Sequence, residues 1–578
     1  MIWELSFKFF KYFIENKIAF YKYFILSFIV GLLELTGVAA TYPFVSKLLS
    51  QDQLTIKTAF LGGLIILAFL TKNFFMIFYS ALQISFIKIC EANISKKFMK
   101  FFIYGDYNIV SKISFAQKNQ IINFLNSTSI NNFLLRLLNL NVNIFIFILI
   151  VGFLFTKFFV ATCVTLISSI IILFLQFAFF KNRITNLSNK LNKAIELLST
   201  SSNQPLLNLK NIKIAKTENY FYNNYSKELE DTRLISKKLS FYNTIPPYVT
   251  EPLIIFLLLI LLTIISLQNI SNTSNLVASY ALIVSATFRL APTISRIQTN
   301  ITGINSAIPQ VKELIMYYEE FHLDKFAISE RNLQTFNSSV ELKNINFAYD
   351  KKQVLKNIDF KIKKGEFIGI AGPSGVGKTT LIDIISGLLK FNSGEIYIDD
   401  KLFSNTQMPS LKIGYIPQEY CIISESIREN VAFGEFEIDD ERVIKALKDA
   451  QLYDYIQENF KNGIYAKPFV DSTGFSLGQK QRLAIARALY SNPDIIIMDE
   501  ATSSLDLETE SEICNTLNKL KGKKTIIAIA HRISTIKNAD TIYYLQNSSI
   551  VDKGAFNKLC LKNEDFKKLV ELNNANLV

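Results

Sequence analysis

Six long apolar stretches in the first half of the chain constrain its fold more than any other feature. They cover roughly residues 19–48, 59–87, 134–156, 158–180, 243–268 and 275–300. Each one reaches the length of about 20 residues that a helix needs to cross a bilayer. Because a backbone in lipid must satisfy its own hydrogen bonds, each stretch is predicted to form a membrane-spanning helix. Only Thr156 and Lys157 separate the third stretch from the fourth, so one continuous helix is the alternative there.

The connections between these stretches differ in charge. The segments 49–58 and 269–274 and the turn near residue 157 are short and nearly uncharged, whereas 88–133 and 181–242 are long and rich in lysine. Lysine and arginine accumulate on the cytoplasmic side of membrane proteins, so the long segments and both termini are predicted to be cytoplasmic. The pattern is typical of a multi-pass protein of the bacterial inner membrane. It also explains the net charge of +13, so no nucleic-acid partner is expected.

The rest of the composition agrees with a membrane protein. Apolar residues make up 50% of the chain and charged residues only 19%. The five cysteines are scattered without metal-type spacing, which predicts free thiols. Residues 1–17 mix lysine and glutamate with aromatic side chains and lack the apolar core of a secretion signal. We expect them to form a helix that lies along the membrane surface.

Several charged residues lie within the apolar stretches. Glu34 and Lys72 are in the middle of the first two, where antiparallel neighbours place them at similar depth. A structural ion pair is the first interpretation, and a role with substrate or protons is the alternative. Arg289 and Arg296 are seven residues apart on one helix face and suit an anionic headgroup such as pyrophosphate. The alternatives are contacts with the cytoplasmic interface and a pair between Arg289 and Glu251.

The second half of the chain carries a phosphate-binding motif. Residues 372–380 read Gly-Pro-Ser-Gly-Val-Gly-Lys-Thr-Thr, which fits G-x-x-x-x-G-K-[ST]. An apolar strand-like run, 367–371, precedes the motif and an apolar helix-like run, 381–389, follows it, as such a loop requires. The glycines let backbone N–H groups turn toward phosphate oxygens, and the helix N-terminus adds its dipole. A glycine-rich turn without a ligand is the alternative.

Further motifs follow this loop in a fixed order. They are Gln418 in Tyr-Ile-Pro-Gln, Phe-Ser-Leu-Gly-Gln at 475–479, Asp499-Glu500 after four apolar residues, Asp506 in Ser-Leu-Asp, and His531 after Ile-Ala-Ile-Ala. With the loop, this set resembles the ATP-binding cassette (ABC) family over roughly residues 339–570. The resemblance implies an ATPase that works as a face-to-face dimer. In that family the signature of one subunit closes over ATP that the other subunit holds.

The resemblance also implies a role for each matching residue. Glu500 is the expected general base, His531 contacts the γ-phosphate, and Gln418 senses Mg²⁺ and the attacking water. Thr379, Gln418 and Asp499 are the expected contacts of Mg²⁺. Tyr349 is at the position that stacks on the adenine. The residues implied to contact ATP are Tyr349, Gly372, Ser374, Gly375, Gly377, Lys378, Thr379, Thr380, Ser476, Gly478, Gln479 and Asp506.

One residue departs from the family pattern. The usual signature is L-S-G-G-Q, but here Leu477 replaces the first glycine. If the backbone at this position requires a positive φ or a close approach to the phosphate, leucine is costly there and hydrolysis is slow. In a homodimer both ATP sites would carry this change, and in a heterodimer only one would. The expected partner is therefore a second copy of the chain or a related half-transporter.

These observations predict a chain of two domains. Residues 1–330 are expected to form an all-α, six-helix transmembrane domain with an interfacial N-terminal helix. Residues 331–578 are expected to form an α/β ATP-binding cassette domain. The first domain resembles type IV, exporter-type ABC transporters. In such transporters short coupling helices dock on the cassettes, and here we expect them near residues 104–114 and 216–225.

Two short segments indicate what the protein moves. Leu-Glu-Leu-Thr-Gly-Val at 33–38 and Phe-Arg-Leu-Ala-Pro at 288–292 resemble bacterial lipid-linked oligosaccharide flippases. The expected function is ATP- and Mg²⁺-dependent export or flipping of an amphipathic substrate by alternating access, with a lipid-linked oligosaccharide as the first choice. Peptide, protein or drug export and an ATP-gated channel are the alternatives.

Overall fold

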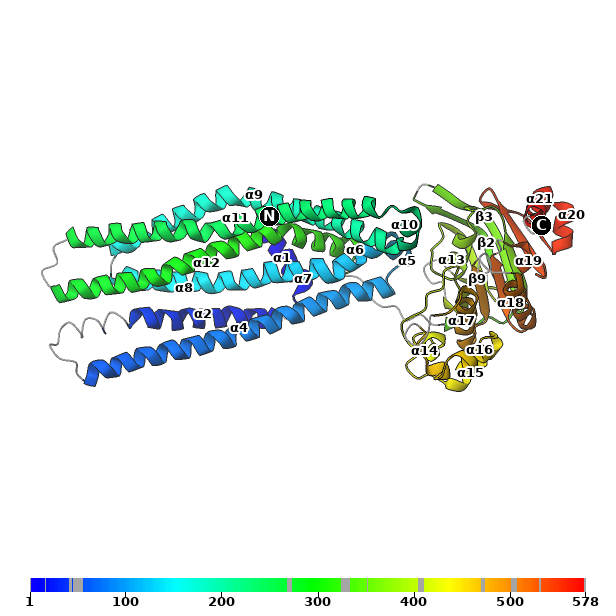
Figure 1. Ribbon diagram of the computed structural model, residues 1–578, viewed down its shortest axis with the longest axis horizontal. Helices are drawn as coiled ribbons and strands as arrows, with labels where there is room; N and C mark the ends of the chain where they lie inside the picture. Colours follow the sequence, from blue (N-terminus) through cyan, green and yellow to red (C-terminus); the bar gives the residue numbers. More distant parts are fainter. Residues whose placement is uncertain are drawn as a thin grey trace. The chain divides into compact units, whose positions relative to one another are not determined.

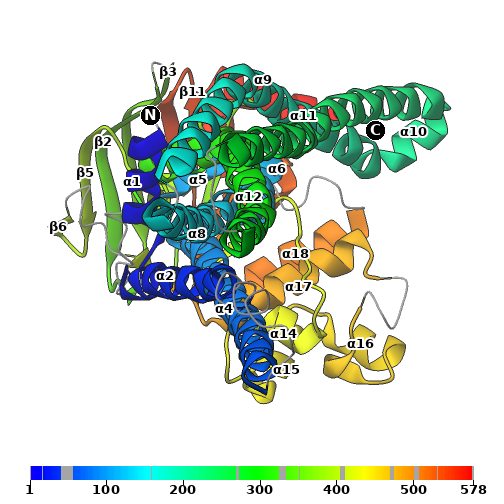
Figure 2. The ribbon, with the colours of Figure 1, turned by 90° about the vertical axis from the view of Figure 1, so that its left-hand side faces the viewer.

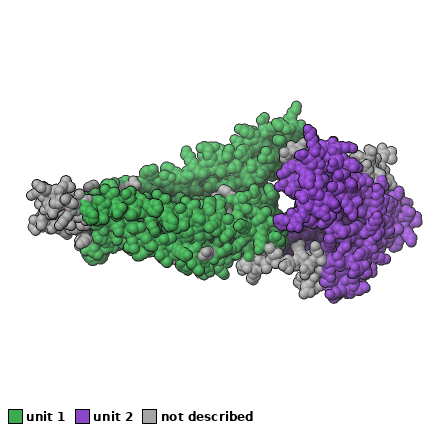
Figure 3. Space-filling model, turned by 90° about the horizontal axis from the view of Figure 1, so that it is seen from below, with its two compact units in different colours: residues 1–105, 109–327 green, residues 106–108, 328–578 purple. Residues whose placement is uncertain are grey.

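The computed structural model divides the chain into two compact units. It describes residues 2–15, 17–40, 44, 56–157, 159–267, 273–323, 333–350, 352–403, 410–468, 474–499, 507–529 and 532–575. The first unit comprises residues 1–105 and 109–327, and the second comprises residues 106–108 and 328–578 (Figure 3).

The first unit is built on six long helices, one for each apolar stretch (Figure 1). They are α2 (Lys17–Ala39), α4 (Ile56–Tyr104), α8 (Leu135–Lys157), α9 (Phe159–Leu207), α11 (Glu218–Leu267) and α12 (Thr273–Glu320). The third and fourth stretches form two helices, α8 and α9, and not one. Within the described residues, 17–36, 62–104 and 130–156 are helical segments long and apolar enough to cross a membrane. At 1.5 Å per residue, the 49 residues of α4 extend about 74 Å, more than twice a bilayer's apolar thickness.

Shorter helices occupy the bends of the first unit. They are α1 (Ile2–Phe13), α5 (Tyr107–Lys112), α6 (Phe115–Asn119), η1 (Gln120–Leu125), α7 (Asn126–Ser129), η2 (Ile130–Leu134) and α10 (Leu209–Ala215). Helix α5 lies inside the segment expected for the first coupling helix. The second expectation is displaced, because α10 ends at Ala215 and Lys216 adopts a left-handed conformation before α11 begins. Helices α9 and α11 pack along each other, as α2 does along α8 and α4 (Figure 2).

Helix α1 packs against the protein through one of its faces. The rings of Phe9 and Phe13 are buried and contact Phe133 and Tyr318, with the Phe9 and Phe133 centroids 5.2 Å apart. The ammonium of Lys8 lies 2.9 Å from a carboxylate oxygen of Glu319 on α12. The aromatic residues of the N-terminus therefore contribute to the core of the first unit, whereas Phe7 stays exposed.

Three charged side chains meet between α2, α4 and α12. The Glu34 carboxylate lies 2.5 Å from Nζ of Lys72 and 2.8 Å from Nη1 of Arg289. Glu34 and Lys72 are buried, and Phe69 lies beside both cations. The structure thus supports the ion-pair interpretation of Glu34 and Lys72. It also gives Arg289 a partner that the sequence did not indicate, while the side chain of Glu251 is outside the described residues.

The second unit is an α/β domain. Its strands are β1 (Leu333–Gln334), β2 (Ser339–Tyr349), β3 (Lys352–Lys363), β4 (Phe367–Ala371), β5 (Ser393–Ile398), β6 (Lys401–Phe403), β7 (Ser410–Leu411), β8 (Ile413–Ile416), β9 (Ile495–Asp499), β10 (Thr525–Ile529), β11 (Thr541–Gln546) and β12 (Ser549–Gly554). Its helices are α13 (Lys378–Ile385), α14 (Ile427–Val431), α15 (Asp440–Asp449), α16 (Tyr453–Asn459), η3 (Gly463–Tyr465), α17 (Leu477–Tyr490), α18 (Leu507–Leu520), α19 (Ile533–Ile536), α20 (Phe556–Lys562) and α21 (Glu564–Ala575).

Two larger sheets organise this domain. One has the order β12-β11-β4-β10-β9-β8, and it is parallel except where β12 joins β11. The other is an antiparallel sheet with the order β3-β2-β5-β6. All five residues of β4, β9 and β10 are buried, because helices or the second sheet cover the parallel sheet. The expected fold class, an all-α membrane-type unit followed by an α/β cassette, is confirmed.

The ion cluster around Glu34 predicts an order of stability among variants. Glu34→Leu removes the only anion of the cluster and leaves Lys72 and Arg289 facing each other, whereas Lys72→Met leaves the Glu34–Arg289 pair intact. Breaking a buried pair costs about 3–5 kcal/mol. We expect thermal unfolding in detergent to give the lowest Tm for Glu34→Leu, a higher Tm for Lys72→Met, and a nearly unchanged Tm for the exposed control Lys22→Met. A lower Tm for Lys72→Met than for Glu34→Leu would contradict this account.

Candidate functional site

The parallel strands bring the candidate site residues to one edge of the large sheet. Ile370 of β4 pairs with Ile529 of β10, and Ile529 pairs with Asp499 of β9. On the far side of β9, Ile416 of β8 pairs with Met498. The phosphate motif follows β4, Gln418 follows β8, and Asp499 ends β9. All three therefore lie at the carboxyl edge, where ligands of such sheets bind.

Glycine shapes the loop between β4 and α13. Gly375 and Gly377 have φ values of 77° and 105°, which a side chain rarely adopts. A Cβ atom on Gly377 would lie 2.8 Å from a methyl group of Leu355 and 3.0 Å from the carbonyl of Val354. Gly377 is also the N-cap of α13, so the loop passes directly into a helix N-terminus. The exposed backbone of this turn is a ready-made anion site.

The side chain of Lys378 curls back over the loop. Its ammonium donates to the carbonyl oxygens of Gly372, at 2.8 Å, and Pro373, at 3.0 Å. The residue is buried, and Thr379 next to it is exposed while Thr380 is buried. The loop thus holds one cation over its own turn, with a hydroxyl beside it at the start of the helix. This arrangement suits a bound phosphate chain.

A pair of carboxylates lies behind this loop. Asp499 is buried, and one of its oxygens accepts a hydrogen bond from the Tyr415 hydroxyl at 3.1 Å. Burial, followed by the neighbouring charge of Asp499, raises the pKa of Asp383 on α13 to about 6. Burial likewise raises the pKa of the Tyr415 hydroxyl, as does the charge of Asp499. A divalent cation would relieve the repulsion between these two carboxylates.

The donor set fits Mg²⁺. The hydroxyl of Thr379 and the carboxylate of Asp499 are hard oxygen ligands, and Mg²⁺ is usually held by one or two carboxylates together with phosphate oxygens. The sequence prediction did not include Asp383 or Tyr415. Asp383 lies four residues after Thr379 on α13, so the helical period was the available signal. The pairing of β8 with β9 brings Tyr415 close to Asp499, and no sequence motif indicates this pairing.

The signature segment forms the start of α17. Ser476 is the N-cap, and its hydroxyl accepts from the Gln479 backbone while the Gln479 side chain accepts from the Ser476 backbone at 2.8 Å. Leu477 is the first helical residue and is absent from the positive-φ positions of the described residues. The condition of a positive φ is therefore not met, because a first-turn helical conformation suits any L-residue; the effect of Leu477 on phosphate approach and on hydrolysis stays a prediction. Its side chain is 45% exposed beside this helix N-terminus.

The remaining predicted residues are placed as follows. Tyr349 ends β2, is partly exposed, and packs edge-on against Phe347 with ring centroids 4.8 Å apart. Gln418 is exposed just beyond β8. Glu500, Asp506 and His531 lie outside the described residues. The structure thus brings the phosphate loop, Gln418 and Asp499 to one edge, and the roles of all the predicted site residues stay predictions.

Comparison with known proteins agrees with this geometry. Residues 355–503 match the ABC transporter family. The chain is 36% identical over 289 residues to the ATP-dependent lipid A-core flippase of Syntrophus aciditrophicus (strain SB), covering 49% of this chain and 46% of that protein. It is 36% identical over 280 residues to the leukotoxin translocation ATP-binding protein LktB of a Pasteurella haemolytica-like species (strain 5943B), covering 47% of this chain and 39% of that protein. The chain thus spans less than half the length of these relatives.

A solved structure extends the likeness to the whole fold. The structure of a bacterial Atm1-family ABC exporter with ATP bound superimposes with a TM-score of 0.81 at 19% identity, covering 96% of this chain and 98% of that one. This likeness is one of fold: a helical membrane-type unit followed by a cassette, whose residues 355–503 match the ABC transporter family.

The carboxylate pair predicts a pH-dependent stability. A folded pKa of about 6, above the ordinary value of 3.8, means that Asp383 favours the folded state at low pH and that this contribution is lost as pH rises through about 6. In the absence of nucleotide and Mg²⁺ we expect Asp383→Asn to raise the Tm at pH 7.5, and the difference from the parent chain to shrink by pH 5. An equal Tm difference at both pH values would contradict the raised pKa of Asp383, which burial and then the charge of Asp499 cause.

Proposed function

We propose that the chain is one half of an ATP-driven exporter of the bacterial inner membrane, active as a dimer of two copies. The observation that supports this proposal most is that the phosphate loop and Asp499 lie at the same edge of the sheet, in a chain whose other unit is a bundle of long apolar helices. In the proposed dimer, the α17 N-terminus of one copy covers the nucleotide held by the loop of the other. Backbone N–H groups and the helix dipole at that terminus suit the phosphate charge.

The chemistry follows from the chain's own residues. Lys378 and the loop N–H groups hold the phosphates, and Tyr349 stacks on the base. Mg²⁺, held by Thr379 and Asp499, would supply neutralisation of phosphate charge when bound. In the proposal Glu500 accepts a proton from the attacking water, and Gln418 and His531 orient that water. Dimer closure on ATP opens the cavity of the membrane unit outward, and hydrolysis resets it.

Two cavities in the first unit support a polar, anionic part of the cargo. One, of about 660 Å³, lies between α8, α9, α11 and α12, and the other, of about 280 Å³, lies between α4, α8 and α12. Arg136 and Thr299 line both, and Arg296 lines the second. Hydroxyl and amide side chains dominate the remaining walls, among them Ser188, Ser240, Asn243, Thr244, Asn139, Asn143 and Asn300.

The arginines of these cavities are available for a ligand. Arg136 and Arg296 make no ion pair with any residue that the structure describes, whereas Arg289 is held by Glu34. Gly303 lets Arg136 pack close to α12, because a Cβ there would lie 3.1 Å from the guanidinium Nε. Arginine binds phosphate oxygens in a bidentate manner. A lipid-linked oligosaccharide on a pyrophosphate combines this anionic group with hydroxyl-rich sugars, and we propose it as the cargo.

Two variants test the nucleotide site. Lys378→Ala removes the cation over the loop, so we expect loss of ATP binding and of turnover. Glu500→Gln removes the proposed base, so we expect turnover to fall by about 100-fold or more while ATP binding is kept. Phosphate release and nucleotide binding are to be measured on the full chain in lipid nanodiscs. Normal turnover in either variant would overturn the site assignment.

Two further variants test the cargo. Arg136→Gln and Arg296→Gln each remove charged hydrogen bonds, so we expect each to raise about 10-fold the concentration of polyprenyl-pyrophosphate glycan that half-stimulates the ATPase. Arg183→Gln, an exposed arginine stacked on Phe179, is the matched control and is expected to change nothing. Stimulation by unmodified peptides with none by the glycan would replace the cargo with a peptide or protein.

A further inference from the structure

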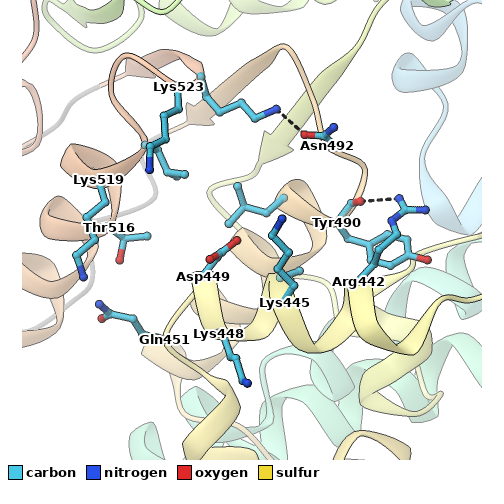
Figure 4. Close-up of a pocket in the computed structure, with 14 residues that line it drawn as sticks. Arg442, Lys445, Lys448, Asp449, Gln451, Tyr490, Asn492, Thr516, Lys519 and Lys523 are labelled. Atoms are coloured by element: carbon cyan, nitrogen blue, oxygen red, sulfur yellow. Dashed lines mark hydrogen bonds between the residues drawn. The ribbon is translucent and has the colours of Figure 1, made fainter.

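A second charged cavity lies in the cassette, away from the phosphate loop. It has a volume of about 790 Å³ and is walled by α15, the last turn of α17, α18 and the turn that leads into β10 (Figure 4). Basic side chains from three of these elements line it: Arg442, Lys445, Lys448, Lys519, Lys523 and Lys524. Asp449 is the one acidic residue of its lining. The cavity therefore concentrates strong positive charge in a confined space.

Much of this charge has no partner. The side-chain ammonium groups of Lys445, Lys519 and Lys523 make no ion pair or hydrogen bond with any residue in the described part of the chain. The other basic groups have neighbours. Lys524 donates to the Asn492 side chain at 2.6 Å and to the Pro493 carbonyl at 2.7 Å. Lys448 lies over the Tyr453 ring, and the Arg442 guanidinium lies 4.0 Å from a carboxylate oxygen of Glu435. Burial lowers the pKa of Lys524; the nearby carboxylate of Asp494 opposes this shift, and neighbouring lysines, Lys445 among them, add to it. Like charges held together in this way are stabilised by a bound anion.

The cavity lies at the opposite end of the sheet from the candidate ATP site. Asn492 precedes β9 and Lys524 precedes β10, whereas Asp499 ends β9. Five residues of strand separate the two edges by about 17 Å. Helix α17 connects the cavity with the signature, because Tyr490 at its last position lines the cavity and Ser476 is its N-cap. Its 14 residues measure about 21 Å. A ligand here does not compete with a nucleotide on the loop.

We propose that this cavity binds a compact polyanion carrying several phosphate groups. The ammonium groups of Lys445, Lys519 and Lys523 would neutralise the charge, and the Asn492 side chain offers a neutral polar contact. The limited size of this half-open cavity favours a small molecule, because a nucleic acid strand requires an extended basic stripe. A soluble oligophosphate and a phosphorylated lipid headgroup share this chemistry. The site is independent of the transport cargo.

Inorganic tripolyphosphate is the probe for this site. Binding is to be measured by calorimetry on the full chain in zwitterionic nanodiscs, with Lys378→Ala in every sample so that the phosphate loop does not contribute. The test variant adds Lys445→Gln, Lys519→Gln and Lys523→Gln. The control adds Lys390→Gln, Lys461→Gln and Lys558→Gln, three exposed lysines elsewhere on the cassette, so both variants have the same net charge.

The expected result is binding that weakens by about 10-fold or more in the test variant and by less than about 2-fold in the control. If anionic lipid in the nanodiscs competes with tripolyphosphate, the site is assigned to a lipid headgroup. If the lipid does not compete, the site is assigned to a soluble phosphate. Both outcomes keep the site. No binding to the Lys378→Ala parent, or equal weakening in the two variants, would overturn the proposal. The single variant Lys445→Gln repeats the comparison if the triple variant unfolds.

Discussion

The parallel pairing of β4, β10 and β9 is the constraint on which the candidate site depends. A register in which Ile370, Ile529 and Asp499 lie side by side brings the phosphate loop and the Asp499 carboxylate to one edge. These strands are buried on both faces, so they hold the candidate site from within the core of the domain. The arrangement of the candidate site is thus set by strand pairing that lies outside the site itself.

The membrane unit has a related constraint, because charge inside an apolar bundle must be compensated. Glu34 is held by two cations from two other helices, which ties α2, α4 and α12 together at one depth. Arg136 and Arg296 lack such a partner among the described residues and face polar cavities instead. Within one bundle, the paired Arg289 thus has a structural role, whereas the two cavity arginines are the ones proposed to bind cargo. It also explains why Arg289 does not belong with the proposed cargo contacts.

Much of the architecture could be predicted from the sequence. Apolar stretches of spanning length predicted the six long helices, since lipid leaves the backbone few choices. The phosphate motif predicted the loop because its flanking strand and helix are strongly apolar. Contacts between distant parts of the chain were harder to predict from the sequence. The contact between Arg289 and Glu34 joins residues far apart in the chain, and Asp383 belongs to no motif. No short helix occupies 216–225, the second segment expected for a coupling helix, because the left-handed turn at Lys216 ends α10 before it and α11 begins at Glu218.

The role of Leu477 shows the same limit. A family pattern suggested strain, but strain is a property of φ and ψ, and the capping box of Ser476 and Gln479 places Leu477 in an ordinary first helical turn. Its exposed side chain beside the helix N-terminus instead agrees with a surface that a second subunit covers.

Cross-linking between two copies tests this account most directly. In a chain whose five native cysteines are replaced, Ser374→Cys on the loop and Leu477→Cys at the signature are introduced on separate copies in the Glu500→Gln background. The account predicts an intermolecular cross-link that forms with Mg²⁺-ATP and is lost without nucleotide. Retained ATP binding with no cross-link, or a cross-link that is indifferent to ATP, would contradict a dimer of identical chains that closes over ATP.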